Sequence, residues 1–150
     1  MIRTQCLVHR GRQILLVKHH FEDVEWWCLP GGGVESDETP PQAALRELEE
    51  ECHVSGKIIR QVGDSRYGDG IVHATYLVDI GSDEPAMGAD PEFSHDEQII
   101  VDMRWLTLAE IPERDRAYLW AAGLMSVPKF QEEVSMWGDA LSYPPLYIKV

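Results

Sequence analysis

Three consecutive glycines followed closely by helix-start signals constrain this chain more than any other feature. Only glycine adopts positive φ at little cost, so we expect a tight loop with accessible backbone at Gly31-Gly32-Gly33. Thr39 is a good N-cap, Pro40 suits the first helical position, and Gln42 completes a Thr-x-x-Gln capping box. We therefore predict a helix that begins after Thr39 and ends near Cys52.

The predicted helix carries an acidic face beside an apolar one. Residues at positions i, i+3 and i+4 share a face at about 100° per residue, so Glu47, Glu50 and Glu51 lie within one arc. Arg46 lies four residues before Glu50, where its guanidinium can pair with a carboxylate and orient it. The adjoining arc, which we expect to pack on a sheet, consists of Ala44, Leu45, Leu48 and Cys52.

Three carboxylates on one face are unfavourable by themselves, because they repel one another and raise each other's pKa. A divalent cation removes this repulsion, and an all-oxygen ligand set suits Mg²⁺ or Mn²⁺ rather than a soft metal. The helix N-terminus behind a glycine loop also suits a phosphate group. A solvated acidic face is the alternative for the carboxylates taken alone, since the chain has 26 Asp+Glu against 13 Lys+Arg.

The acidic balance also limits the partners of this chain. A net charge of −13 argues against a nucleic-acid polymer, whose binding relies on Lys and Arg replacing counterions. A small phosphorylated ligand remains compatible, because a bound cation reverses the local charge. No run reaches the ~18 apolar residues of a membrane span, and the N-terminus lacks signal-peptide features. With three cysteines and no C-x-x-C pair, we expect free thiols and a cytoplasmic protein that contacts no membrane.

The rest of the pattern predicts an α+β fold, because strands, a helix, further strands and a second helix follow one another. We expect a single domain over residues 1–150, with 126–150 as a C-terminal tail. A hairpin turning at Gly11-Arg12 should join residues 4–8 to 14–17, followed by a loop over 19–25. The other predicted elements are strands at 26–29, 58–62, 71–80 and 98–105, a short turn or helix at 107–111 and a helix at 117–125.

Residues Gly32 to Val54 resemble the Nudix box of the Nudix hydrolases. That family's pattern is G-x5-E-x7-R-E-U-x-E-E-x-G-U, where U is a bulky aliphatic residue, and this chain matches every fixed position except one. His53 stands where the family has glycine. We expect it to end the helix in the left-handed conformation, at a cost of about 1 kcal/mol. The resemblance implies a Nudix-type mixed β-sheet sandwiched between helices.

The resemblance also implies an activity: metal-dependent hydrolysis of a pyrophosphate bond in a nucleoside diphosphate derivative, with water attacking phosphorus. Mg²⁺ or Mn²⁺ would be held by the carboxylates of Glu47, Glu50 and Glu51, and a backbone carbonyl, best assigned to Gly31, would add a ligand. The substrate can be a nucleotide sugar, an ADP-ribose-like compound or a nucleoside triphosphate. The alternative is a catalytically inactive Nudix-fold module that binds or senses a nucleotide.

Roles for the other motif residues follow from the same resemblance. Arg46 would orient the acidic cluster, while Gly32 and Glu38 would be structural, with Glu38 holding the loop to the helix. The general base is either Glu50 or a carboxylate of a later loop. The candidates in that loop are Glu97 first, then Glu92 and Asp96.

Residues that bind the rest of the substrate are not identified by the sequence. Trp26 and Trp27 alternate across a strand, so one is expected in the core while the other can stack on a base. For His19-His20 a surface location competes with phosphate contact, and core packing competes with a pocket position for Tyr67, His73 and Tyr76. The aromatic tail from Trp137 to Tyr147 suits packing against a second copy, so a homodimer is an option.

Overall fold

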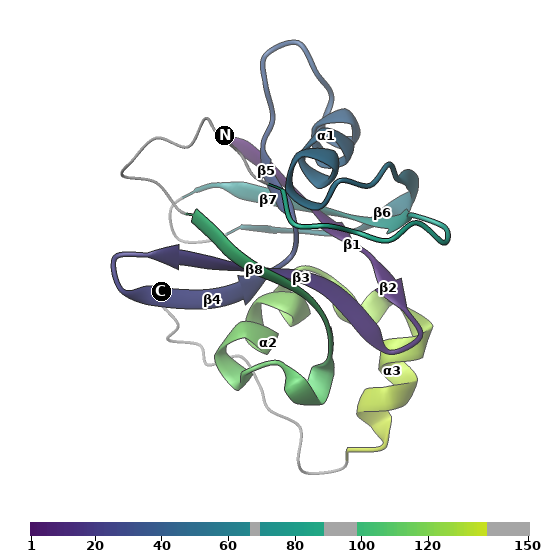
Figure 1. Cartoon of the computed structure of the whole chain (residues 1–150). Coiled ribbons are helices and arrows are strands. Elements are labelled where there is room, and N and C mark those ends of the chain that lie inside the picture. The colour runs from purple at the N-terminus through teal and green to yellow at the C-terminus, as the bar shows by residue number, and fades with distance from the viewer. Residues whose placement is uncertain (67–69, 89–98, 138–150) are drawn as a thin grey trace.

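The computed structural model of this chain describes residues 1–66, 70–88 and 99–137, and Figure 1 shows two sheets with helices on either side. The strands are β1 (Ile2–Leu7), β2 (His9–Arg10), β3 (Gln13–Phe21), β4 (Val24–Cys28), β5 (Gly31–Gly33), β6 (Lys57–Arg66), β7 (Val72–Asp79) and β8 (Ile99–Thr107). The helices are α1 (Pro40–Cys52), α2 (Glu113–Ala121) and α3 (Pro128–Ser135), with 3₁₀ turns η1 (Leu108–Glu110) and η2 (Leu124–Ser126). This arrangement confirms the predicted α+β class.

The first sheet is mixed, because one of its strand pairs is parallel. Its order is β5-β1-β7-β6, with β1 parallel to β7 and the other pairs antiparallel. The second sheet runs β2-β3-β4, with β8 antiparallel to β3. In Figure 1, α1 lies against the first sheet, and α2 and α3 cover the far side of the second. The expected layering of helices outside β-structure is therefore confirmed.

The strand β3 contributes to two cores at once. Ile14, Leu15, Leu16 and Val17 are all buried, since both faces of the second sheet are covered. Leu15 and Val17 join the core between the sheets, together with Leu48 and Cys52 of α1. Ile14 and Leu16 face the opposite way and pack with Leu119 of α2 and Phe130 of α3. The acidic helix is thus fixed to the sheets by its apolar face.

Two segments that we expected to be loops are strands. The glycine triplet pairs antiparallel with β1, with Gly32 opposite Thr4. A Cβ at Gly31 would lie 1.9 Å from the Thr4 carbonyl oxygen, so this close pairing requires glycine. Residues 19–25 form the β3–β4 hairpin. Its two-residue turn places Glu22 and Asp23 at φ of 49° and 66°, the positive values that such turns require.

The C-terminal part also differs from the expectation. The second helix begins at Glu113, four residues before the predicted start, and the chain turns at Gly123 with φ of 103°. A further helix, α3, begins within the expected tail and buries Phe130 completely. Residues 138–150, which include most of the aromatic tail considered for dimerisation, lie outside the described residues. No helix in the described ranges is long and apolar enough to cross a membrane.

Local signals predicted both ends of α1 correctly. The Thr39 side chain accepts a hydrogen bond from the Gln42 backbone at 3.3 Å, and the Gln42 side chain accepts one from the Thr39 backbone at 2.9 Å. His53 ends the helix in the left-handed conformation, at φ of 55° and ψ of 37°. Its N–H donates to the Glu49 carbonyl at 2.9 Å, so the substitution at the family's glycine position keeps the cap geometry.

Replacing His53 with glycine should raise the free energy of unfolding by up to about 1 kcal/mol, because glycine removes the cost of the left-handed conformation. Greater freedom of the unfolded chain offsets part of this gain. The control is His53→Ala, which keeps a Cβ and should bring no gain. Thermal denaturation followed by circular dichroism measures both, and equal melting temperatures for the two variants would contradict the expectation.

Candidate active site

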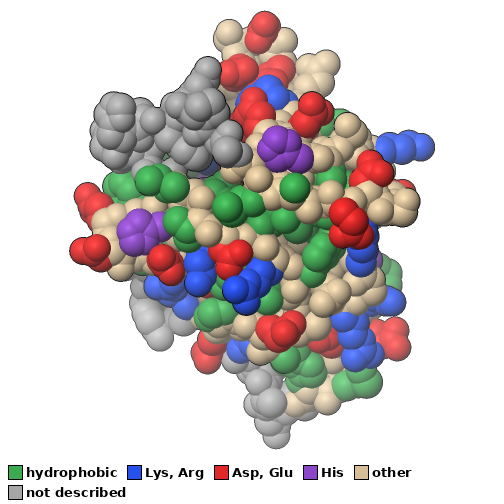
Figure 2. Space-filling view, viewed as in Figure 1, with side chains coloured by type: hydrophobic (Ala, Val, Ile, Leu, Met, Phe, Trp, Pro, Cys, Tyr) green, Lys and Arg blue, Asp and Glu red, His purple; other side chains and the backbone are tan. Residues whose placement is uncertain are grey.

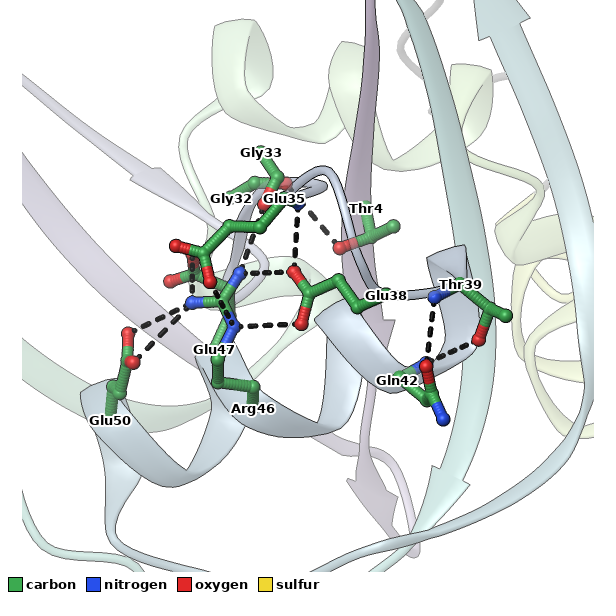
Figure 3. Close-up of polar contacts among 10 residues, drawn as sticks. All are labelled: Thr4, Gly32, Gly33, Glu35, Glu38, Thr39, Gln42, Arg46, Glu47 and Glu50. Atoms are coloured by element: carbon green, nitrogen blue, oxygen red, sulfur yellow. Dashed lines mark hydrogen bonds and ion pairs between the residues drawn. The ribbon is translucent and has the colours of Figure 1, made fainter.

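Arg46 lies at the centre of the polar network that joins α1 to the segment after β5 (Figure 3). Its guanidinium donates two hydrogen bonds to Glu38, at 2.6 and 3.0 Å, and a third to the Gly33 carbonyl at 3.1 Å. Glu38 also accepts the Glu35 backbone N–H at 2.9 Å. The paired hydrogen bonds raise the pKa of Arg46 and lower the pKa of Glu38. Glu38 therefore ties the segment before α1 to the helix.

The same guanidinium also contacts two of the predicted metal ligands. It lies 3.1 Å from Glu47 and 3.3 Å from Glu50, and Figure 3 shows the carboxylates of Glu38, Glu47 and Glu50 around this guanidinium. The Glu47 carboxylate is packed so closely on Gly32 that a Cβ there would lie 2.3 Å from its Oε1. Burial raises the pKa of Glu47, and Arg46 opposes that shift. Gly32 thus leaves the space that the Glu47 carboxylate occupies.

Glu51 also contacts β5, at the neighbouring Gly31. Its Oε1 accepts a hydrogen bond from the Gly31 N–H at 3.1 Å. Burial, with repulsion from Glu47 as the next cause, raises the pKa of Glu51 to about 8. The Gly31 backbone therefore contacts this acid through its N–H, while metal binding by its carbonyl stays a prediction.

The three acids of α1 do not converge on one point. Within residues 1–66, 70–88 and 99–137, no three His, Cys, Asp or Glu side chains form a ready metal cage. Arg46 draws Glu47 and Glu50 toward itself, whereas Glu51 turns to Gly31. Their chemistry still fits a hard divalent cation, because all donors are carboxylate oxygens and the repulsion between Glu47 and Glu51 is only partly neutralised.

The C-terminal end of α1 is capped by the segment that follows β7. The Gly88 N–H donates to the Glu51 carbonyl and the Ala86 N–H to the Cys52 carbonyl, each at 2.9 Å. A Cβ at Gly88 would lie 2.1 Å from the Glu50 carbonyl, so this contact requires glycine. These bonds satisfy carbonyls that a helix end leaves unpaired. The sequence predicted a long loop here and offered no signal for this contact.

Arg10 fixes the start of the same capping segment. Its guanidinium bonds Glu84 at 2.9 Å and the Gly81 carbonyl at 3.0 Å, contacts the Asp83 carbonyl, and lies 4.9 Å from the centroid of the Trp105 ring. The segment is therefore held at one end by β2 and at the other by α1. Sequence reasoning missed Arg10 because its partners lie more than 70 residues away.

An open pocket of about 400 Å³ lies along the outer side of α1. Its lining residues are Arg46, Glu49, Glu50 and His53. Arg46 and Glu50 also belong to the ion-pair network, so the pocket borders that network. The later carboxylates Glu92, Asp96 and Glu97 lie outside the described residues, as does Tyr67. Tyr76, which we considered for a pocket, is buried in the core between the sheets.

Comparisons with known proteins agree with this architecture. A family model of the NUDIX domain matches residues 2–126. The chain therefore belongs to the NUDIX domain family.

Among individual proteins, the chain is 37% identical over 79 residues to the diphosphoinositol polyphosphate phosphohydrolase NUDT4B of Homo sapiens. The aligned region covers 50% of this chain and 42% of that protein. The matched region is thus less than half the length of that relative. A MutT NUDIX hydrolase from Burkholderia pseudomallei is 26% identical and superposes with a TM-score of 0.61 over 74% of this chain and 85% of that one. An Ap4A hydrolase from C. elegans is 17% identical, with a TM-score of 0.62 over 89% and 98% of the chains, and shows the shared fold.

The raised pKa of Glu51 predicts a pH-dependent stability for the metal-free protein. As the pH rises from 4.5 to about 8, the unfolded chain releases this proton while the folded chain keeps it. The folded state therefore loses stability across that window, by on the order of a few kcal/mol. Urea denaturation of metal-free protein between pH 5 and pH 8.5 measures the loss. Glu51→Gln removes the titrating group and should flatten the profile, so parallel profiles for both proteins would refute the assignment.

Proposed function

We propose that this chain is a Nudix pyrophosphohydrolase that cleaves a nucleoside diphosphate derivative with Mg²⁺ or Mn²⁺. The observation that carries the proposal is the pair Glu47 and Glu51, two partly buried acids whose pKa values are raised first by burial, with Glu50 adding to the shift of Glu47 and Glu47 adding to the shift of Glu51. Such a pair is costly without a positive charge beside it. Glu47, Glu50 and Glu51 would hold the cation, with the Gly31 carbonyl as a further ligand.

When bound, the cation would neutralise the substrate's phosphate oxygens and acidify the attacking water. Arg46 would keep Glu47 and Glu50 oriented. Together with the cation, it would neutralise the negative charge of these two carboxylates. Its bidentate bond to Glu38 keeps the guanidinium in place while it does so. Retention of all these charged residues favours turnover over a binding or sensor module.

A carboxylate would accept one proton from the attacking water. The water oxygen would then bond to phosphorus while the bond between phosphorus and the bridging oxygen breaks. Glu50 is a candidate base, because it is exposed and lines the pocket beside Arg46. Glu97 is the other candidate, carried over from the resemblance. A base in either position would act together with neutralisation of the phosphate charge. That neutralisation supplies most of the rate acceleration in phosphoryl transfer.

A second substrate class comes from the curated relative, whose name gives diphosphoinositol polyphosphate. Both classes contain a phosphoanhydride bond, so the acids of α1 would serve either. For the wider setting we propose a cytoplasmic enzyme that acts on small phosphorylated molecules, with no nucleic-acid polymer or membrane as partner. A homodimer remains an option.

A substrate screen tests the proposal directly. Nucleotide sugars, ADP-ribose, nucleoside triphosphates and diphosphoinositol polyphosphates are incubated with Mg²⁺ or Mn²⁺, and the products are identified by mass spectrometry. Glu50→Gln and Glu51→Gln should each lower kcat at least about a hundredfold by removing a carboxylate from the charge-stabilising set. Glu132→Gln, which changes an exposed acid of α3 outside the pocket lining, is the control and should keep its activity. Unchanged turnover in both ligand variants would remove the catalytic assignment.

The contact between Gly32 and Glu47 makes a second prediction. In Gly32→Ala the new Cβ would lie 2.3 Å from Glu47 Oε1, so the carboxylate must move while the backbone keeps its place. We expect kcat to fall about tenfold through this misplacement, with little change in melting temperature. Gly33→Ala is the matched control, because its Cβ would meet no atom within 4 Å. Equal activity of the two alanine variants would show that Glu47 needs no such placement.

A further inference from the structure

Arg3 of β1 is a half-buried cation that forms no hydrogen bond or ion pair within the described ranges 1–66, 70–88 and 99–137. In this it differs from Arg46, whose guanidinium is bonded to Glu38, Glu47 and Glu50. A guanidinium carries five N–H donors in a rigid fork and cannot lose its charge in a protein. The donors of Arg3 are therefore available to a ligand.

Strand pairing brings Arg3 to the part of the sheet that contacts the acids. Arg3 lies opposite Gly33 of β5, about 4.8 Å away across the sheet, and β5 is an edge strand of the first sheet. This edge strand is bonded to α1 twice, since the Gly31 N–H donates to Glu51 and the Gly33 carbonyl accepts from Arg46. Because β5 consists of glycines, it has no side chain that could pair with the guanidinium or separate it from the acids.

The charge of Arg3 acts on two of the predicted metal ligands. Burial raises the pKa of both Glu47 and Glu51, and the charge of Arg3 acts to lower the pKa of each. Such an interaction weakens with distance and is screened by water, so the guanidinium lies near both carboxylates. A positive charge there would repel a divalent ion held by the same acids. Metal binding alone therefore does not account for Arg3, whereas an anion held between the two positive charges does.

The Arg3 side chain lies on the face of the first sheet that is turned away from the apolar side of α1. Cys6, three residues along β1, donates to the Ala44 carbonyl of α1, and side chains alternate between faces along a strand. The row that contains Arg3 continues through His73 of β7 to Ser65 of β6. The Ser65 Oγ is buried without a hydrogen-bond partner among the described residues. Arg3 thus belongs to a polar row rather than to either core.

Cations are scarce where this row meets α1. Figure 2 shows acidic side chains gathered over the end of the molecule that contains α1, and the chain has a net charge of −13. Two neighbouring phosphates that approach this end need more than one positive partner. A divalent ion would supply the first. Arg46 is already committed to three carboxylates, so Arg3 is the cation left to supply the second.

We propose that Arg3 binds one of two neighbouring phosphates of the substrate, while the divalent cation at Glu47 and Glu51 binds the other. This inference rests on the proposed function and deepens it, because it requires a diphosphate that reaches from the acids to β1. The guanidinium fork would donate to two oxygens of its phosphate. Arg3 is then a substrate-binding residue, with a role separate from that of Arg46, which orients the acids.

Methylenebisphosphonate, an analogue of a diphosphate that hydrolysis does not cleave, tests this assignment without turnover. Its binding to Mn²⁺-loaded protein is measured by calorimetry, and Arg3→Gln should weaken it at least about tenfold. Arg3→Lys keeps the charge but loses the fork, so it should retain part of the affinity. The matched control is Arg12→Gln, at an exposed arginine in the turn between β2 and β3, and it should bind like the wild type. Thermal melts show whether each variant is folded.

Two comparisons separate phosphate binding from a role in ordering or balancing the acids. Inorganic phosphate, which the cation can hold alone, should bind Arg3→Gln nearly as tightly as the wild type. Mn²⁺ itself, measured by electron paramagnetic resonance, should bind Arg3→Gln at least as tightly, because a repelling charge is gone. Weaker Mn²⁺ binding, equal losses for phosphate and bisphosphonate, or unchanged bisphosphonate affinity would each overturn the assignment.

Kinetics with the substrate found in the screen keep this inference distinct from the proposed function. Arg3→Gln should raise KM at least about tenfold by removing a substrate contact. If Glu51→Gln abolishes hydrolysis but Arg3→Gln changes neither KM nor bisphosphonate binding, the role of Arg3 is wrong and the enzyme assignment stands. If Arg3→Gln weakens bisphosphonate binding in a chain that hydrolyses nothing in the screen, the role of Arg3 in phosphate binding stands and the enzyme assignment fails.

Discussion

The ion pair between Arg46 and Glu38 is the interaction on which the site depends. It closes the segment between β5 and α1 with two hydrogen bonds of 2.6 and 3.0 Å, and the same guanidinium neutralises Glu47 and Glu50. An exposed ion pair contributes little to stability. A guanidinium that binds one carboxylate through two hydrogen bonds and contacts further acids also fixes the positions of those side chains. Without it, the segment between β5 and α1 would lose its side-chain bond to the helix, and the guanidinium that neutralises Glu47 and Glu50 would lose its anchor.

The two ends of α1 are held by different means, and this explains how the chain tolerates His53. At the N-terminus, a capping box supplies local partners. At the C-terminus, the capping segment brings the N–H groups of Ala86 and Gly88 to the last carbonyls, so termination does not depend on a glycine after the helix. The turn that bears Glu50 and Glu51 is therefore fixed from both the helix and a distant part of the chain.

The features that could be predicted from the sequence are those that depend on residues close together in the chain. The capping box, the helix bounds and the left-handed His53 are local features, and all three are found as predicted. The strand formed by the glycine triplet and the helix around Phe130 depend on partners far along the chain, so no window of sequence contained them. Residue spacing likewise placed Glu47, Glu50 and Glu51 on one helix, but it could not show that Arg46 and Gly31 would draw their carboxylates apart.

This separation of the acids follows from electrostatics. The Arg46 guanidinium is itself a cation and lies beside Glu47 and Glu50. A divalent ion would compete with it for these two carboxylates. Glu51 keeps a raised pKa, although the Gly31 N–H and the charge of Arg3 both act to lower it. The network thus has one acid pair stabilised by Arg46 and one acid left costly in its charged form. That imbalance is what a hard cation would relieve, because a divalent charge can neutralise Glu51 while Arg46 remains bonded to Glu38.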